Sequence, residues 1–258
     1  MVGSDSAHGL ERFGRGLVLT PGLTVFAEDR AAAVTHHAHP AWKVVLSQHG
    51  HAEVRRKGHA PLRAAGLIVP PQLAHVCLTS GPYVAVFLDA WRGDPWHGAA
   101  GPLSLEQATV RRLLDAARLH HDADLPSLRA ELTPLLGGPP VLDQRMEHAL
   151  NHLAEPVRLA DLAAEVGLST SRLRALARSA VGVPLARLRQ WARLRTAVAH
   201  LAEHPPATAA HVAGFADQPH LTRLARRMVG RTPRSLKAAI DAPGHAGAAV
   251  RARRRPAW

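Results

Sequence analysis

The stretch Val212–Pro233, VAGFADQPHLTRLARRMVGRTP, decides the fold of the C-terminal part of this 258-residue chain. Its first residues complete a short apolar helix, Gly214 permits a turn, and the next helix begins near Asp217 and ends before Gly230. Two short helices joined by a glycine-containing turn, the second of them rich in arginine, are typical of a helix-turn-helix. The stretch therefore predicts binding to DNA.

The same pattern occurs once more, earlier in the chain. LAAEVGLSTSRLRALARSAVG (162–182) and AAHVAGFADQPHLTRLARRMVG (209–230) form an imperfect internal repeat, and Ser169 is suited to cap the second helix of the first copy. A helix expected over residues 185–201, about 25 Å long, joins the copies. Two such units could place their second helices in successive major grooves, about 34 Å apart.

The distribution of charge points to the same partner. The chain carries a net charge of +12, and residues 158–258 hold 18 Lys and Arg against 5 Asp and Glu, whereas residues 1–157 hold 14 against 15. A positive excess confined to one helical segment favours a polyphosphate partner. The alternatives are a helical bundle whose basic face is merely solvated and a partner-binding adaptor that has lost its affinity for DNA.

Composition bounds the compartment and the class of protein. A hydrophobic content of 47% suffices for two modest domains. No run of about 18 apolar residues occurs, and the N-terminal MVGSDSAHGLERFGRG lacks the apolar centre of a signal peptide. The single Cys77 excludes an internal disulfide framework and fits a reducing compartment. We expect a cytoplasmic protein with no membrane partner.

The pattern of secondary structure changes near residue 100. Short apolar or alternating runs bounded by Gly or Pro, from Gly16 to Ala90, predict a small β-barrel or sandwich. Helical patterns follow, and the Gly/Pro cluster at 137–140 marks a domain boundary. The fold class is α+β with several domains: a β-barrel (1–100), linker or dimerisation helices (101–138), an all-α domain with two helix-turn-helix units (139–240) and a disordered basic tail (241–258).

The helical region resembles the DNA-binding domain of AraC/XylS-type transcription regulators over about a hundred residues, from Val141 to Ala238. The resemblance is carried by LADLAAEVGLS (159–169), Arg193-Leu194 with Ala197, GFADQ (214–218), Arg223 and GRTPRSLK (230–237). It implies a sequence-specific regulator that binds double-stranded promoter DNA and has RNA polymerase as a further partner. The linker helices could pack against a second copy, in a homodimer, or on the barrel.

The resemblance also implies which side chains contact DNA. Bases would be read by Ser171, Arg172 and Arg174 in the first recognition helix and by Gln218, Thr222 and Arg223 in the second. Arg can bind guanine through two hydrogen bonds, and Gln can pair with adenine. Phosphate contacts are expected of Arg178, Arg226, Arg227, Arg231 and Arg234, and such contacts set register and salt dependence.

Several positions depart from the family pattern. The chain has Ala177 and Ala225 where an aromatic residue is usual, and Pro206 and Ala209 where Ile is usual. Ala in place of a buried Phe forfeits on the order of 3 kcal/mol unless neighbours fill the space. We therefore expect the second unit to be the less stable one, ordered fully only on DNA.

The N-terminal region resembles the cupin-like sensor barrel of many such regulators, through HHAHPAWKVVLSQHGHAEV (36–54) and AAGLIVPPQLAHVCL (64–78). This resemblance implies that His37 and His39 point into the barrel, since residues i and i+2 of a strand share a face, with His75 as the later histidine. Lys43 occupies the place of the expected acidic ligand. Because its ammonium repels a cation, a catalytic iron or manganese site is disfavoured.

The candidate effector-binding residues are His37, His39, Trp42, Lys43 and His75. They suit a small molecule with an anionic or hydrogen-bonding group. The three histidines with Cys77 could instead hold zinc, but our prediction is no metal, no cofactor and no catalytic residue, since phosphate-binding loops and nucleophile motifs are missing from the sequence. The function predicted is an effector-sensing transcription regulator; the alternative is a cupin-type metal-dependent enzyme with a helical appendage.

Overall fold

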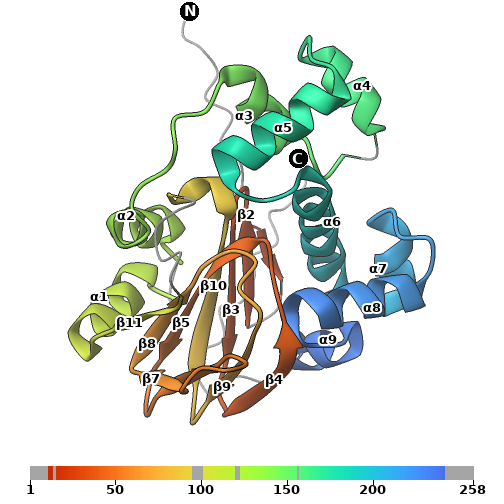
Figure 1. Ribbon diagram of the computed structural model, residues 1–258. Coiled ribbons are helices and arrows are strands. Elements are labelled where there is room, and N and C mark those ends of the chain that lie inside the picture. The colour runs from red at the N-terminus through yellow and green to blue at the C-terminus, as the bar shows by residue number, and fades with distance from the viewer. Residues whose placement is uncertain (1–10, 14–15, 95–100, 120–122, 156, 242–258) are drawn as a thin grey trace, which may run out of the picture.

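The computed structural model describes residues 11–13, 16–94, 101–119, 123–155 and 157–241 (Figure 1). The predicted basic tail, apart from Asp241, lies outside the described residues. The N-terminal region is a β domain, helices α1 and α2 follow it, and the remaining helices form the C-terminal domain.

Two antiparallel sheets build the β domain. In spatial order the seven-stranded sheet consists of β1 (Glu11–Phe13), β2 (Leu17–Thr20), β3 (Leu23–Glu28), β10 (Tyr83–Asp89), β5 (Ala41–Ser47), β8 (Gly66–Val69) and β11 (Leu103–Leu105). The four-stranded sheet consists of β4 (Ala32–His37), β9 (His75–Thr79), β6 (Ala52–Arg55) and β7 (Leu62–Ala64). The residues between the sheets include Val45, Val54 and Leu67, which pack in one apolar cluster.

Strand β5 shows how the seven-stranded sheet separates two environments. Trp42, Val44 and Leu46 join an apolar cluster with α1 (Gln107–Ala117) and α2 (Leu125–Leu135), which cover the outer face of the sheet. Val45 joins the cluster between the sheets, and Lys43 shares its side of the strand. This alternation follows from the two-residue period of a strand.

The C-terminal domain contains the two predicted helix-turn-helix units. Its helices are α3 (Gln144–Asn151), α4 (Leu159–Glu165), α5 (Thr170–Val181), α6 (Leu185–Leu201), α7 (Pro206–Val212), α8 (Gln218–Val229) and α9 (Pro233–Asp241). We call α4 with α5 the first unit and α7 with α8 the second unit. The connecting helix α6 has the bounds that the sequence predicts.

Capping residues set the ends of both recognition helices. Ser169 accepts a hydrogen bond from the backbone N–H of Arg172 at 3.2 Å, which confirms it as the cap of α5. Asp217 accepts one from the N–H of His220 at the start of α8. Both helices end at a glycine with positive φ, Gly182 and Gly230, as the pattern of turns predicts.

The small residues of the second unit are buried, and the β domain completes their core. Ala225 is fully buried in a cluster that includes Ala41, with Phe87 packed against it. Ala209 is fully buried in another cluster that includes Phe26. The space left by the missing larger side chains is therefore closed partly by the neighbouring domain. The lower stability of the second unit stays a prediction.

The predicted fold class is confirmed: an N-terminal β domain, linker helices and a C-terminal helical domain with two helix-turn-helix units. One local difference concerns residues 103–105, which lie beyond the predicted end of the β domain and pair with β8 as β11. Within the described part of the chain, no helix is both long and apolar enough to cross a membrane.

Candidate functional site

The predicted base-reading residues lie mainly on exposed faces of the two recognition helices. The exposed members are Ser171, Arg172 and Arg174 on α5 and Gln218 and Arg223 on α8, and Thr222 is half-buried. The opposite faces carry buried residues such as Leu173 and Leu224, which anchor each helix in its unit. This geometry permits both helices to present polar side chains to a duplex.

The predicted phosphate contacts divide into two groups. Arg178, Arg226, Arg227 and Arg234 are exposed. Arg231 instead lies within the molecule, where its guanidinium forms an ion pair with Glu28, whose carboxylate also accepts a hydrogen bond from the hydroxyl of Tyr83. Burial and the neighbouring Glu28 raise the pKa of Tyr83 far above its usual value, so this hydroxyl stays protonated. Arg231 is thus held by the β domain in this arrangement.

The C-terminal end of α8 is docked on strand β4. The carbonyl oxygen of Gly230 accepts hydrogen bonds from the N–H of Thr35 at 3.3 Å and from its hydroxyl at 3.0 Å. The N–H of Ala38 donates to the carbonyl oxygen of Arg227 at 3.0 Å. Figure 1 shows α8 and α9 beside β4. Backbone groups therefore join the second unit directly to the β domain.

Helix α6 is anchored on the same domain through buried charges. The guanidinium of Arg195 forms an ion pair with Asp89 at 3.2 Å and donates to the hydroxyl of Thr24 at 2.9 Å. The indole N–H of Trp191 donates to the same Asp89 carboxylate at 3.2 Å. The sequence alone marks Arg195 only as a basic residue of the helix, because its partner Asp89 is about a hundred residues earlier in the chain.

A cavity lies between the β domain and the C-terminal domain, and we call it the interface cavity. It contains about 740 Å³ of space between atoms, part of it open to solvent. The β domain contributes mostly apolar side chains, and the C-terminal domain contributes residues of α6 and the end of α8; examples are Phe26, Val45, Phe87, Leu194, Val198 and Val229. An apolar ligand placed here would touch both domains.

Three cationic side chains line the interface cavity: Lys43, Arg195 and Arg231. Asp89 pairs with Arg195, and Glu28 pairs with Arg231. Among the described residues, none forms an ion pair with Lys43, whose ammonium lies 5.9 Å from the centre of the Phe87 ring. Lys43 is 5% exposed, so its charge has little access to bulk water.

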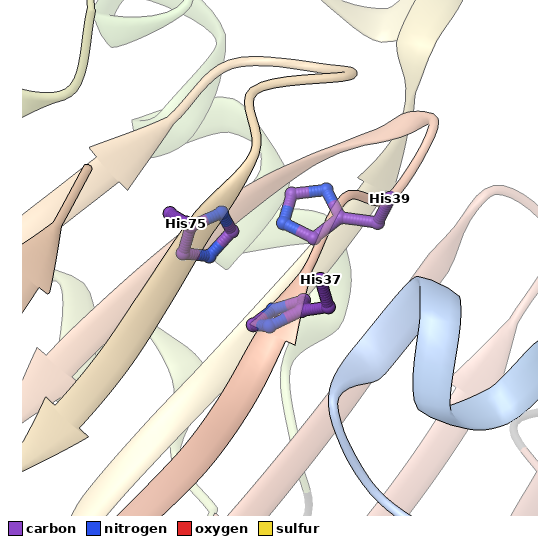
Figure 2. Close-up of side chains that lie close together, drawn as sticks. All are labelled: His37, His39 and His75. Carbon is purple, nitrogen blue, oxygen red and sulfur yellow. The ribbon is translucent and has the colours of Figure 1, made fainter. Parts of the chain in front are cut away.

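His37, His39 and His75 lie together next to this cavity, and we call them the histidine cluster (Figure 2). They come from β4, the turn after it and β9, and all three are buried. The ring centres of His37 and His75 are 4.2 Å apart. The strand pair β4 and β9 brings the two parts of the cluster together, because His37 is directly opposite His75 in the register.

The three rings are neutral near neutral pH. Burial, together with the charge of Lys43, lowers the pKa of His37 to about 2 and that of His75 to about 3. Burial also holds the pKa of His39 well below its usual value. Desolvation disfavours the charged form of a histidine, so these directions follow from the position of the cluster.

The structure brings together four of the five predicted effector residues. Trp42 lies apart from them, because it faces α1 and α2 on the outer side of the sheet. Lys43, the next residue of the strand, faces the space between the sheets. Its indole N–H donates to the carbonyl oxygen of Ala90. Cys77 lines the interface cavity and is not part of the histidine cluster.

Comparisons with known proteins agree with this architecture. Residues 162–239 match a family model described as a helix-turn-helix domain. An apo variant of ToxT from Vibrio cholerae strain SCE256 is 13% identical, with 85% of this chain and 98% of that chain covered and a TM-score of 0.58. Unsaturated fatty acid bound wild-type ToxT from this strain is 10% identical, with 89% and 98% covered and a TM-score of 0.54.

A third structure, ToxT from Vibrio cholerae O395 bound to (E)-4-(8-methylnaphthalen-1-yl)but-3-enoic acid, is 12% identical, with 85% and 98% covered and a TM-score of 0.53. At these identities the likeness concerns the fold. No curated protein sequence gives a significant match to the chain.

The fold and the exposed basic helices define the class of the molecule as a DNA-binding protein with two helix-turn-helix units. Residues 162–239 form a helix-turn-helix domain, the kind of domain that places a recognition helix on DNA.

Proposed function

We propose that this regulator binds an apolar carboxylic acid in the interface cavity and reads two half-sites of a promoter with its two units. The observation that carries the proposal is the ammonium of Lys43, which faces an apolar cavity without an acidic partner among the described residues. A carboxylate that reached Lys43 would form a charge-assisted hydrogen bond in a poorly hydrated place.

The ligands of the structural neighbours support this class of effector. One ToxT structure holds an unsaturated fatty acid and another holds a naphthalenyl butenoic acid. Both ligands combine an apolar body with a carboxyl group. The interface cavity offers the matching surfaces, apolar walls and one cation without a carboxylate partner.

The position of the cavity explains how binding would be transmitted. Its walls belong to both domains, so a ligand in it adds contacts that depend on how α6 and α8 sit on the sheets. A ligand shifts a conformational equilibrium only by binding one state more tightly than the other. We expect a saturating acid to change the affinity for promoter DNA by about fivefold or more.

Calorimetry with cis-9-hexadecenoate as the probe tests the effector. Lys43→Met should weaken binding of the acid by at least about tenfold, because it removes a charge-assisted hydrogen bond. The matched control is Lys57→Met, whose side chain is exposed on the turn after β6 and should leave binding unchanged. Equal affinity of the wild-type protein for the acid and for its methyl ester would overturn recognition of a carboxylate.

Selection of bound duplexes from a random DNA pool tests the reading of bases. Arg174→Ala and Arg223→Ala should each relax the recovered motif in one half-site, since each exposed guanidinium can discriminate a base pair by about 1–3 kcal/mol. Arg111→Ala removes an exposed Arg from α1, far from both units in sequence, and should leave the motif intact. If the wild-type protein enriches no sequence, specific regulation is the wrong function.

Three further assignments belong to the proposal. RNA polymerase is the expected protein partner at a promoter, and the exposed face of α1 and α2 is available for a homodimer contact. A promoter-binding protein acts where the chromosome is, so we place it in the cytoplasm. The alternative of a cupin-type enzyme has less support, because Lys43 occupies the place of a carboxylate ligand beside the histidine cluster.

A further inference from the structure

Each ring of the histidine cluster is oriented by a backbone carbonyl group. The Nδ1 atoms of His37, His39 and His75 lie 2.7, 2.7 and 2.8 Å from the carbonyl oxygens of Thr35, Ala41 and Leu73. A carbonyl oxygen only accepts hydrogen bonds, so each Nδ1 carries the proton of the neutral ring. The Nε2 atom of each ring is therefore an unprotonated acceptor.

These three Nε2 atoms are buried and have no hydrogen-bond partner. One ligand atom from each ring lies within 4.8 Å of the others. Buried polar atoms in native proteins are nearly always satisfied, so three convergent lone pairs call for a common partner that accepts electron pairs. We propose that the histidine cluster binds one divalent late transition-metal ion, such as Zn²⁺, and that the ion changes the docking of α8 on β4.

The donor set suits this class of ion. Neutral imidazoles are ligands for zinc, copper and nickel, whereas calcium and magnesium prefer oxygen. Metal-bound histidines usually donate their other N–H to a carbonyl or carboxylate, which is the arrangement of all three rings here. Lys43 opposes the ion electrostatically, as its influence on the pKa of each ring shows, and so it sets an upper limit on affinity.

The coupling of metal binding to α8 follows from the distances between the histidine nitrogens. An ion held at about 2.0–2.1 Å from each nitrogen brings the nitrogens to about 3.4 Å from one another. The ligand atoms lie within 4.8 Å of one another, so any pair farther apart than the metal geometry allows must approach. His37 sits where the pairing of β4 with β9 is irregular, between Val34 and His37. This segment is deformable because a register shift interrupts its ladder.

The same segment carries the hydrogen bonds that hold the second unit. Thr35 donates twice to the carbonyl of Gly230, and Ala38 donates to that of Arg227. A Cβ atom built on Gly230 would lie 2.6 Å from the carbonyl oxygen of Thr35 and 2.9 Å from Nδ1 of His37, so the contact is tight. A shift of His37 toward the ion must therefore be transmitted to the end of α8.

Metal binding is tested on the full-length protein after removal of metals with a chelator. Calorimetry with Zn²⁺ and absorption spectra with Co²⁺ should show one saturable site with nitrogen ligands. His75→Gln should weaken it at least 100-fold, and His75→Ala, compared with it by circular dichroism, guards against a folding defect. His36→Ala is the matched control, because His36 is on the same strand but exposed and outside the cluster. Binding that is absent, or equal in His75→Gln and His36→Ala, overturns the site.

Two further measurements test whether the charge of Lys43 lies beside the metal site and whether metal binding is coupled to the docking of α8. Lys43→Met should tighten Zn²⁺ binding about tenfold or more while it weakens binding of the carboxylic acid, so the two ligands respond with opposite signs. Hydrogen exchange should show altered protection of the Thr35 and Ala38 amides when Zn²⁺ is added. Unchanged protection in a protein that binds Zn²⁺ overturns the coupling. Neither measurement involves DNA, so failure here is distinct from failure of the proposed regulator function.

Discussion

The ion pair between Arg231 and Glu28 joins the second unit to the β domain through buried charges. The two side chains are 15% and 6% exposed, and Tyr83 donates a further hydrogen bond to the same carboxylate. Removing one partner of a buried pair leaves the other charge without compensation, and this usually costs more than the pair itself contributes. The pair is therefore a sensitive probe of the docked arrangement.

We expect Glu28→Gln to lower the free energy of unfolding by about 3 kcal/mol, measured by urea denaturation. The double variant Glu28→Gln with Arg231→Met should recover most of the loss, because no buried charge then lacks a partner. Asp161→Asn is the control: it breaks an ion pair with Arg158 whose side chains are 85% and 51% exposed. Such an exposed pair contributes little to stability, because water screens it. Equal losses in the two single variants would contradict the role assigned to burial.

The histidine cluster predicts how stability depends on pH in the chelator-treated protein. The pKa values of His37 and His75 lie at about 2 and about 3 in the folded state, against 6.5 when exposed. Above pH 6.5, His37 and His75 are neutral in both the folded and the unfolded protein. Below pH 6.5, these histidines gain protons only in the unfolded protein. The free energy of unfolding therefore falls as the pH drops toward 3. The loss is up to about 1.4 kcal/mol per pH unit for each ring.

Urea unfolding at pH 7 and pH 5 measures this dependence. The wild-type protein should lose more stability between these values than His75→Gln, which has one such ring fewer. His36→Ala, whose side chain is exposed, should follow the wild type. Parallel curves for the wild type and His75→Gln would show that His75 titrates normally in the folded protein.

At the scale of elements, the junction of α8 with β4 depends on a close approach at Gly230. Gly230 has a φ of 69°, which favours glycine, and its position leaves no room for a side chain. Gly214, in the turn of the second unit, has a φ of 71° and nothing within 4 Å of an added Cβ. The two glycines thus share the backbone conformation and differ in their surroundings.

Gly230→Ala and Gly214→Ala therefore form a matched pair. Both should lose about 1 kcal/mol for the positive φ. Gly230→Ala should in addition raise hydrogen exchange at Thr35 and Ala38, because the new methyl group displaces α8 from β4. If Gly214→Ala raised exchange at these two amides equally, the effect would belong to backbone strain rather than to the lost contact.

The ends of the helices can be predicted from residues close to them in the sequence. The cap at Ser169 and the glycines at 182 and 230 predict where α5 and α8 end, because capping depends on side chains within three residues. Strand β11 is less predictable from the sequence. Residues 103–105 precede a helical pattern, and only their pairing with β8, nearly forty residues earlier in the chain, makes them a strand.

At the scale of the whole molecule, we expect the docked arrangement to compete with DNA for Arg231. The family resemblance assigns this side chain to phosphate, whereas the structure pairs it with Glu28. Each phosphate neutralised by a cation steepens the dependence of log affinity on log salt concentration by about 0.9. Release of Arg231 from the β domain should therefore be visible in a salt titration.

We expect Glu28→Gln to bind the selected duplex more tightly at low salt, with a salt slope steeper than that of the wild type by about 0.9. Fluorescence anisotropy at several salt concentrations measures both quantities. The double variant Glu28→Gln with Arg231→Met should lack the added slope, since it has no cation to release. A slope unchanged by Glu28→Gln would mean that Arg231 does not reach phosphate even when freed.

The sequence by itself determined the helical domain, its two units and their basic faces, because these depend on capping, periodicity and charge within short segments. It also grouped His37, His39 and His75 through the resemblance to a sensor barrel. Only the tertiary structure decided that Trp42 lies on the other face of the sheet, that Asp89 and Glu28 neutralise two cations of the C-terminal domain, and that Lys43 lacks such a partner among the described residues. These facts depend on contacts between residues far apart in the chain, which a local pattern of side chains does not encode.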